Sequence, residues 1–220
     1  MKRIMIKADS GRWLMMIVVG ILTSIGVSSC EEHTDIYDNT IKVGSILLSD
    51  NTITAPAGYD TNSRQAAGII FYVNKDTVLV VGLKELGRYQ YADSLGTVSS
   101  VMNDMYSKCG TENTAAIMAS DIKSPAVEAV KNYLSPVSGW ALPSAGELMA
   151  LSENLPRVAS SMKIVKGDAF SREQYVSSSQ DGASSESEQM YYYSVSLQNG
   201  FVTSTVKTVA GKVRPVLRLR

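Results

Sequence analysis

The segment Gly139-Trp140-Ala141-Leu142-Pro143-Ser144-Ala145-Gly146-Glu147-Leu148 decides how this chain folds. Its second half is a capping box, in which the Ser144 hydroxyl accepts a hydrogen bond from one amide at the start of a helix and the Glu147 carboxylate accepts one from another. Leu148, Leu151 and Leu155 continue at helical spacing, so they predict the buried face of that helix. The sequence thus predicts a well-capped helix in the second half of the chain.

A second helix is predicted upstream of this segment. Ser124 supplies an N-cap, and Pro125 occupies the first helical position, where proline is well tolerated. Val127, Val130, Lys131 and Leu134 follow at helical spacing, and Pro136 ends the helix. The chain is therefore expected to contain two short helices.

Strands are predicted before the helices. We expect a short apolar strand over residues 44–48 and a polar loop over residues 50–65. Two continuous apolar runs, residues 68–73 and 77–83, predict a hairpin that is buried on both faces. Residues 87–110 show weak periodicity, so we expect irregular structure there.

Strands are also predicted after the helices. From Tyr175 onward the pattern alternates, and Asn199-Gly200 predicts a type I′ turn into a strand over residues 201–207. A last strand is expected over residues 213–219, where Pro215 indicates an edge strand or a bulge. A hairpin, two helices and a β-meander in this order predict an α+β fold with antiparallel sheets.

Three segments of the chain resemble bacterial C-type-lectin-like domains. Residues 139–148 are similar to the GW-x-LPS-x-E-L segment of these domains, Tyr175-Val176-Ser177-Ser178-Ser179 to their YWSSS strand, and Val213-Arg214-Pro215-Val216 to their closing VRPV strand. Formylglycine-generating enzymes and the major paralogous surface domains of unknown function share this broad fold. The resemblance covers about residues 44–220, and it implies a C-type-lectin-like domain over residues 43–220 without implying an activity.

Architectural roles are expected for the residues that carry this resemblance. Trp140 is predicted to be a core anchor for the loop before the capped helix, because a buried tryptophan removes a large apolar area from water. Pro143 fixes the entry into that helix, which Ser144 and Glu147 then cap. Arg214 is expected to satisfy backbone carbonyls or a carboxylate beneath the loops.

The first 29 residues are typical of a lipoprotein signal peptide. Four basic residues precede an apolar run over residues 14–27, which is too short to span a bilayer comfortably. Val27-Ser28-Ser29-Cys30 resembles the lipobox of bacterial lipoproteins. The resemblance implies that Cys30 is acylated and becomes the new N-terminus, so that its lipid anchors the protein in a membrane. The alternative is an ordinary signal peptide with an incidental cysteine.

Residues 30–42 are expected to form a solvated acidic tether. Glu31, Glu32, Asp35 and Asp38 precede Lys42, the first basic residue after Cys30, and no apolar periodicity is present. Acidic residues directly after the lipid cysteine also resemble the surface-export signal of lipoproteins in some Gram-negative anaerobes. That resemblance implies the outer face of the outer membrane, with a periplasm-facing location as the alternative.

Charge and cysteine content exclude two classes of protein. Residues 1–29 hold four of the 21 basic and one of the 21 acidic residues, so the mature chain carries about three excess negative charges and nothing predicts a nucleic-acid partner. If Cys30 carries lipid, Cys109 has no partner within the chain, and no disulfide framework can form. Cys109 is expected to be a small buried residue.

Catalytic motifs do not assemble in the sequence, which predicts neither an enzyme nor a cofactor. His33, the one histidine, lies in the tether, and formylglycine chemistry needs a pair of cysteines where the domain has Cys109 alone. The Ser-x-x-Lys match at residues 160–163 lacks the partner motifs of penicillin-binding enzymes. Asp181, Glu186 and Glu188 have no spacing that specifies a calcium site, so no metal is predicted.

Binding is the function that the sequence favours. The serine-rich segment over residues 177–188 is expected to form a solvated loop. The predicted contact residues are Ser178, Ser179, Gln180 and Asp181 of this loop, together with Tyr191 of the strand that follows it. We expect a surface-anchored lipoprotein with a non-catalytic, adhesin-like domain whose ligand is a glycan or a protein. The alternative is a structural or accessory subunit of a cell-surface assembly.

Overall fold

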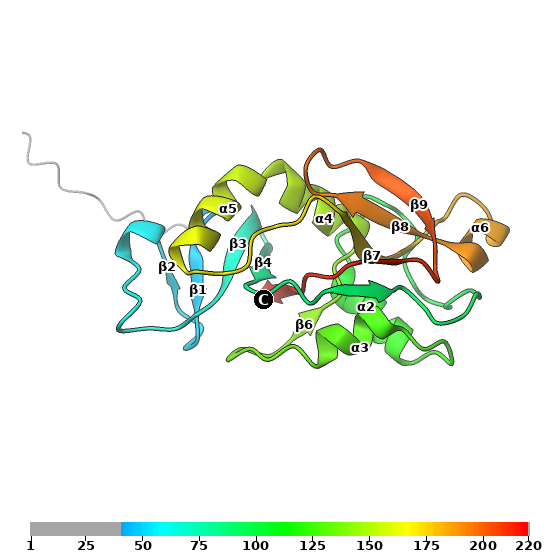
Figure 1. Cartoon of the computed structure of the whole chain (residues 1–220), viewed down its shortest axis with the longest axis horizontal. Coiled ribbons are helices and arrows are strands. Elements are labelled where there is room, and N and C mark those ends of the chain that lie inside the picture. Colours follow the sequence, from blue (N-terminus) through cyan, green and yellow to red (C-terminus); the bar gives the residue numbers. More distant parts are fainter. Residues whose placement is uncertain (1–40, 220) are drawn as a thin grey trace, which may run out of the picture. The chain divides into compact units, whose positions relative to one another are not determined.

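The computed structural model describes residues 41–219, and Figure 1 shows how their elements are arranged. The predicted signal peptide, Cys30 and the predicted tether up to residue 40 lie outside the described residues. Within residues 41–219, no helix is long and apolar enough to cross a membrane.

The first sheet is built around the predicted hairpin. Its strand order is β2 (Ile53–Thr54), β1 (Ile46–Leu48), β3 (Ala66–Asn74), β4 (Thr77–Gly82), β11 (Val216–Leu219) and β6 (Trp140–Ala141). The hairpin β3–β4 is confirmed, and Ile69, Ile70, Val80 and Val81 are all fully buried. Adjacent residues on one strand point to opposite faces, so this hairpin is buried on both faces.

The second sheet contains the C-terminal strands. Its order is β5 (Arg88–Gln90), β10 (Ala210–Lys212), β7 (Gln174–Gln180), β8 (Tyr191–Ser196) and β9 (Val202–Val206). Strands β10 and β7 are parallel, and the other paired strands are antiparallel. With the helices described next, the two sheets confirm the α+β class.

The prediction of two short helices is wrong. The described residues form α2 (Gly110–Met118), α3 (Pro125–Lys131), α4 (Ala145–Glu153), α5 (Leu155–Ile164), α6 (Ser185–Met190) and the 3₁₀ helix η1 (Pro56–Gly58). Asn154 ends α4 and begins α5, so the predicted apolar face of one helix, including Leu155, is shared by two. Helix α3 ends at Lys131, and Leu134 is 94% exposed beyond it.

Two predictions for the C-terminal strands also need correction. Pro215 lies just before β11, which is an internal strand between β4 and β6, so this strand is not an edge. The connection between β8 and β9 is longer than a two-residue turn, because Ser196 N donates to Phe201 O at 2.9 Å and Gly200 N donates to Ser196 O at 2.8 Å. Gly200 has a φ of +71°, whereas Asn199 does not have a positive φ, so the turn is not type I′.

Helix α4 lies between the two sheets and contacts β3 of the first sheet and β7 and β8 of the second (Figure 1). Its Leu148 and Leu151 are fully buried in the main apolar cluster. Directly before the helix, β6 pairs with β11 of the first sheet, and Pro143 O accepts a hydrogen bond from Ser178 N of β7 at 2.7 Å. The segment from β6 to α4 therefore joins both sheets.

The capping box of α4 is present in the structure. Glu147 N donates to Ser144 Oγ at 3.2 Å, and Ser144 N donates to Glu147 Oε2 at 3.0 Å. The same carboxylate accepts from Gly110 N at 3.3 Å, and Arg218 of β11 lies 3.8 Å from it. Glu147 is 1% exposed, and this burial raises its pKa despite the hydrogen bonds from Ser144 and Gly110.

Two glycines allow this close packing. A Cβ on Gly110 would lie 2.2 Å from Glu147 Oε2, and a Cβ on Gly146 would lie 2.3 Å from Tyr106 O. Neither distance is compatible with a side chain, so any larger residue would displace the start of α2 or of α4.

Arg214 and Trp140 have different surroundings. Arg214 is fully buried, donates to Asp168 O at 2.7 Å and 3.2 Å, and lies 4.3 Å from the centre of the Phe170 ring. Trp140 is half-buried and donates through Nε1 to Val137 O at 2.7 Å. It packs against two smaller apolar clusters and not within the main one. Trp140 therefore lies at the edge of the core.

Replacing Ser144 by Ala should lower the free energy of unfolding by about 1–2 kcal/mol, because it removes the N-cap of α4. It also removes the hydrogen bond that Ser144 Oγ donates to Ser107 O at 2.7 Å. Urea unfolding measures the change. Ser160→Ala is the control, because this exposed hydroxyl bonds only the Pro156 carbonyl of its own helix and its loss should cost about 0.5 kcal/mol or less. Equal losses in the two variants would contradict the assignment.

Candidate functional site

Most of the residues predicted to contact a ligand are buried. Ser178, Ser179, Gln180 and Asp181 are each at most 5% exposed, and only Tyr191 is half-buried. The prediction of a solvated loop that begins at Ser177 is wrong here, because residues 177–180 belong to β7, an internal strand that α2 and α4 cover. The side chains of Ser178, Ser179, Gln180 and Asp181 are therefore unable to meet a ligand directly.

The buried side chain of Gln180, at the end of β7, anchors a long loop by hydrogen bonds. The long loop is residues 91–109, between β5 and α2. The Gln180 side chain accepts from Val98 N at 2.8 Å and donates to Val98 O at 3.0 Å. The side-chain amide thus satisfies both backbone groups of one loop residue, as a neighbouring strand would.

Asn113 of α2 holds the long loop in the same way at a second point. Its side chain accepts from Met102 N at 2.8 Å and donates to Met102 O at 3.3 Å. It also donates to Ser178 O of β7 at 3.4 Å, and it is 1% exposed. The side-chain amides of Gln180 and Asn113 therefore bond the long loop at two residues that are four positions apart.

Lys207 provides a third attachment beneath the long loop. It is fully buried, and its ammonium group donates to Gly96 O at 2.6 Å, to Gln180 Oε1 at 2.6 Å and to Glu188 O at 2.5 Å. Burial lowers the pKa of Lys207 to about 8. The bonds join the loop, β7 and α6 at one cation.

Short-range hydrogen bonds shape the end of the long loop. Asp104 accepts from Tyr106 N at 3.0 Å and from Ser107 Oγ at 2.7 Å, and these bonds hold the pKa of its carboxyl below the usual range. Ser107 O in turn accepts from Ser144 Oγ at the start of α4. The position of Tyr106 is thereby fixed relative to the capped helix.

The long loop presents three large apolar side chains to solvent. Leu95 is 52% exposed, Met102 is 50% exposed and Tyr106 is 66% exposed.

No family model and no curated protein matches this chain. The site is therefore assigned from geometry: apolar side chains on a loop with a fixed backbone are typical of a surface that binds a partner.

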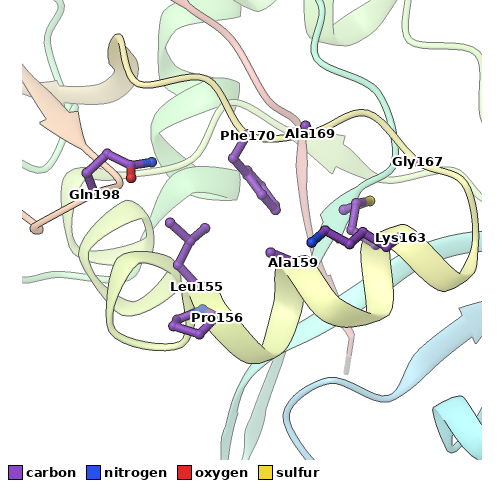
Figure 2. Close-up of a pocket in the computed structure, with 9 residues that line it drawn as sticks. Leu155, Pro156, Ala159, Lys163, Gly167, Ala169, Phe170 and Gln198 are labelled. Carbon is purple, nitrogen blue, oxygen red and sulfur yellow. The ribbon is translucent and has the colours of Figure 1, made fainter.

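Figure 2 shows a hollow beside α5, and none of its lining residues belongs to the long loop. Leu155, Pro156 and Ala159 of α5 line one side, and Phe170 lies across from them. Lys163 and Gln198 point their polar ends toward the hollow. Its volume is about 320 Å³, which lies at the lower end of the range of small-molecule sites, and its walls are mainly apolar.

The nucleophiles near this hollow and in the core are not activated. Ser160 donates to Pro156 O at 2.9 Å and Ser161 donates to Gly44 O at 2.7 Å, and no hydrogen bond found in residues 41–219 joins Ser160 to Lys163. Cys109 is 5% exposed, and its burial together with the charge of Glu147 raises the pKa of its thiol to about 11. The hollow therefore offers shape and charge but no reactive pair.

The three acidic residues considered as calcium ligands have different positions and partners in the structure. Asp181 accepts from Ser204 Oγ at 2.5 Å and from Tyr193 OH at 3.0 Å; burial acts to raise its pKa, but these bonds hold the pKa below the usual range. Glu186 and Glu188 lie on α6, where Glu188 accepts from Asn103 of the long loop. In the part of the chain that the structure describes, no group of three or more His, Cys, Asp or Glu could hold a metal ion.

The sequence did contain a signal for the long loop. Leu95, Met102 and Tyr106 are large apolar residues in a segment without strand or helix periodicity, so no regular element could bury all of them. Asn113 and Lys207 carried no comparable signal, because they bond Ser178 and Gly96, which lie 65 and 111 positions away in the sequence.

Replacing Gln180 by Met should release the long loop while keeping the fold. The change leaves both backbone groups of Val98 without partners, which costs about 1–3 kcal/mol for each buried group that finds no water. Hydrogen exchange should show lost protection of the Val98 amide, with the Ile69 amide of β3 still protected. Gln198→Met, the same exchange at an exposed position, is the control. Unchanged protection at Val98 would contradict the anchoring role of Gln180.

Lys207 should give the domain a distinct dependence on pH. Its folded pKa of about 8 lies below the ordinary lysine value, so between these values the unfolded chain binds a proton that the folded chain lacks. The free energy of unfolding should therefore rise as pH rises from about 8 toward 10, relative to Lys207→Met. Urea unfolding of both proteins at pH 7.5 and pH 9.5 tests this. A constant difference between the two proteins would count against a depressed pKa.

Proposed function

We propose that this chain is a surface-anchored lipoprotein whose C-type-lectin-like domain binds a protein ligand without catalysing a reaction. In this proposal Cys30 carries the lipid and residues 30–42 hold the domain away from the outer membrane. The long loop, residues 91–109, is the contact surface.

The observation that carries the proposal is the way the long loop is held. Gln180 and Asn113 each bond the backbone of one loop residue, and Lys207 bonds a third. A loop that is already ordered loses little conformational entropy when it binds, so more of its contact energy appears as affinity. Buried side chains are being used to fix a surface segment, which is the arrangement that a binding module needs.

The exposed side chains favour a protein ligand over a glycan. Tyrosine and methionine are enriched in protein interfaces, and Leu95, Met102 and Tyr106 supply one aromatic and two flexible apolar contacts.

Changing Leu95 and Tyr106 to Ser together should weaken binding by tenfold or more, because central apolar contacts contribute about 1–2 kcal/mol or more each. The purified chain is applied to arrays of host and neighbouring-cell surface proteins and of glycans, and affinity for any protein hit is then measured. Leu134→Ser is the matched control, since this leucine is 94% exposed outside the long loop. All variants should unfold at similar urea concentrations.

Three results would contradict the proposal in different ways. Saturable binding to glycans alone would overturn the protein ligand. Equal affinity of the loop variant and the Leu134→Ser control would remove the long loop from the interface. A stoichiometric partner recovered from the cell's own membrane would favour the accessory-subunit alternative.

A further inference from the structure

Strand β9 is an unprotected sheet edge. Among the described strands it pairs with β8 on one side only, and it is the last strand of the second sheet (Figure 1). The other three edge strands are shorter: β2 and β6 have two residues each, and β5 has three residues including the charged Arg88. β9 has five residues, Val-Thr-Ser-Thr-Val, without a charge, a proline or a bulge. These are the devices by which sheet edges normally avoid pairing.

The outward backbone groups of β9 can be assigned from the ends of its ladder. Ser196 N donates to Phe201 O, and Lys207 N donates to Met190 O, so residues 201 and 207 bond toward β8. Because bonding direction alternates along an antiparallel strand, residues 203 and 205 also bond toward β8. Val202, Ser204 and Val206 therefore direct their N–H groups away from the sheet, and Thr203 and Ser204 have exposed side chains.

The sequence of β9 reads the same in both directions around Ser204. If two copies align antiparallel about a two-fold axis at Ser204, Val202 faces Val206, Thr203 faces Thr205 and Ser204 faces Ser204 of the second copy. Opposed β-branched pairs are favourable, and no like charges meet. The strand is thus complementary to itself, which is the requirement of an isologous interface.

An exposed apolar side chain lies at the start of β9. Phe201, just before the strand, is 66% exposed. With the two-fold axis at Ser204, Phe201 of each copy faces residue 207 of the other, so each end of the junction carries one phenylalanine. From the free edge and the palindrome, we propose that β9 joins two copies of this chain by antiparallel pairing, forming one continuous sheet across the pair.

Self-association of the full chain tests the proposal. In sedimentation equilibrium in detergent, the weight-average mass should rise from one chain toward two over about 10 µM to 1 mM, because a junction of one strand pair is small. Ser204→Lys and Ser204→Glu should each weaken association by about threefold to fivefold, since like charges then face each other at the axis. An equimolar mixture of the two should associate again. Ser204→Gln controls both for side-chain size and for the loss of the hydrogen bond that Ser204 Oγ donates to Asp181, which all three variants share.

Cross-linking tests the register. In a Cys30→Ser background, Ser204→Cys should form a disulfide-linked dimer on mild oxidation, because directly opposed residues of a hydrogen-bonded pair lie about 5.5 Å apart at Cα. Thr203→Cys is the matched control: Thr203 is also an exposed residue, but it faces residue 205 of the second copy. A chain that stays monomeric over the whole range, or equal cross-linking of the two cysteine variants, would overturn the proposal. Pairing of β9 with an unrelated extended peptide in place of a second copy would overturn it as well.

Discussion

The carboxylate of Glu147 lies where three segments far apart in the sequence meet. It accepts hydrogen bonds from the first amides of α4 and α2, through Ser144 and Gly110, and Arg218 of β11 lies 3.8 Å away. A buried carboxylate is unfavourable unless its oxygens are bonded in this way, so each of these segments must be in place for the others to be stable. The close approach to Gly110 leaves no room for a side chain, which makes the arrangement specific.

From this centre the structure extends to both sheets and to the long loop. β6 and α4 flank the capping box and join the first sheet to the second, while Ser144 also bonds Ser107 at the end of the loop. Polar side chains that would ordinarily be exposed, notably Gln180, Asn113 and Lys207, complete the support from within. The domain therefore combines an apolar core between its sheets with a polar layer beneath one surface.

Local signals in the sequence predicted the elements that depend on local physics. The β3–β4 hairpin, the start of α3 at Ser124 and the capping box of α4 all arise from residues close together in the chain. Helix α2 was missed because Cys109 gives it no side-chain cap, and the break between α4 and α5 was hidden by continuous apolar spacing. Residues 177–181 were expected to be solvated because they are polar. Their partners include Val98 and Asn113, more than 60 positions away, and no local pattern carries that information.

The two amides beneath the long loop bond backbone atoms, which every residue type except proline provides in full. Nothing in these contacts reads the side chains of Val98 or Met102. Related chains that keep Gln180 and Asn113 could therefore diversify the outward positions of the loop extensively at little cost to folding. One scaffold could then present many different binding surfaces, each with its own specificity.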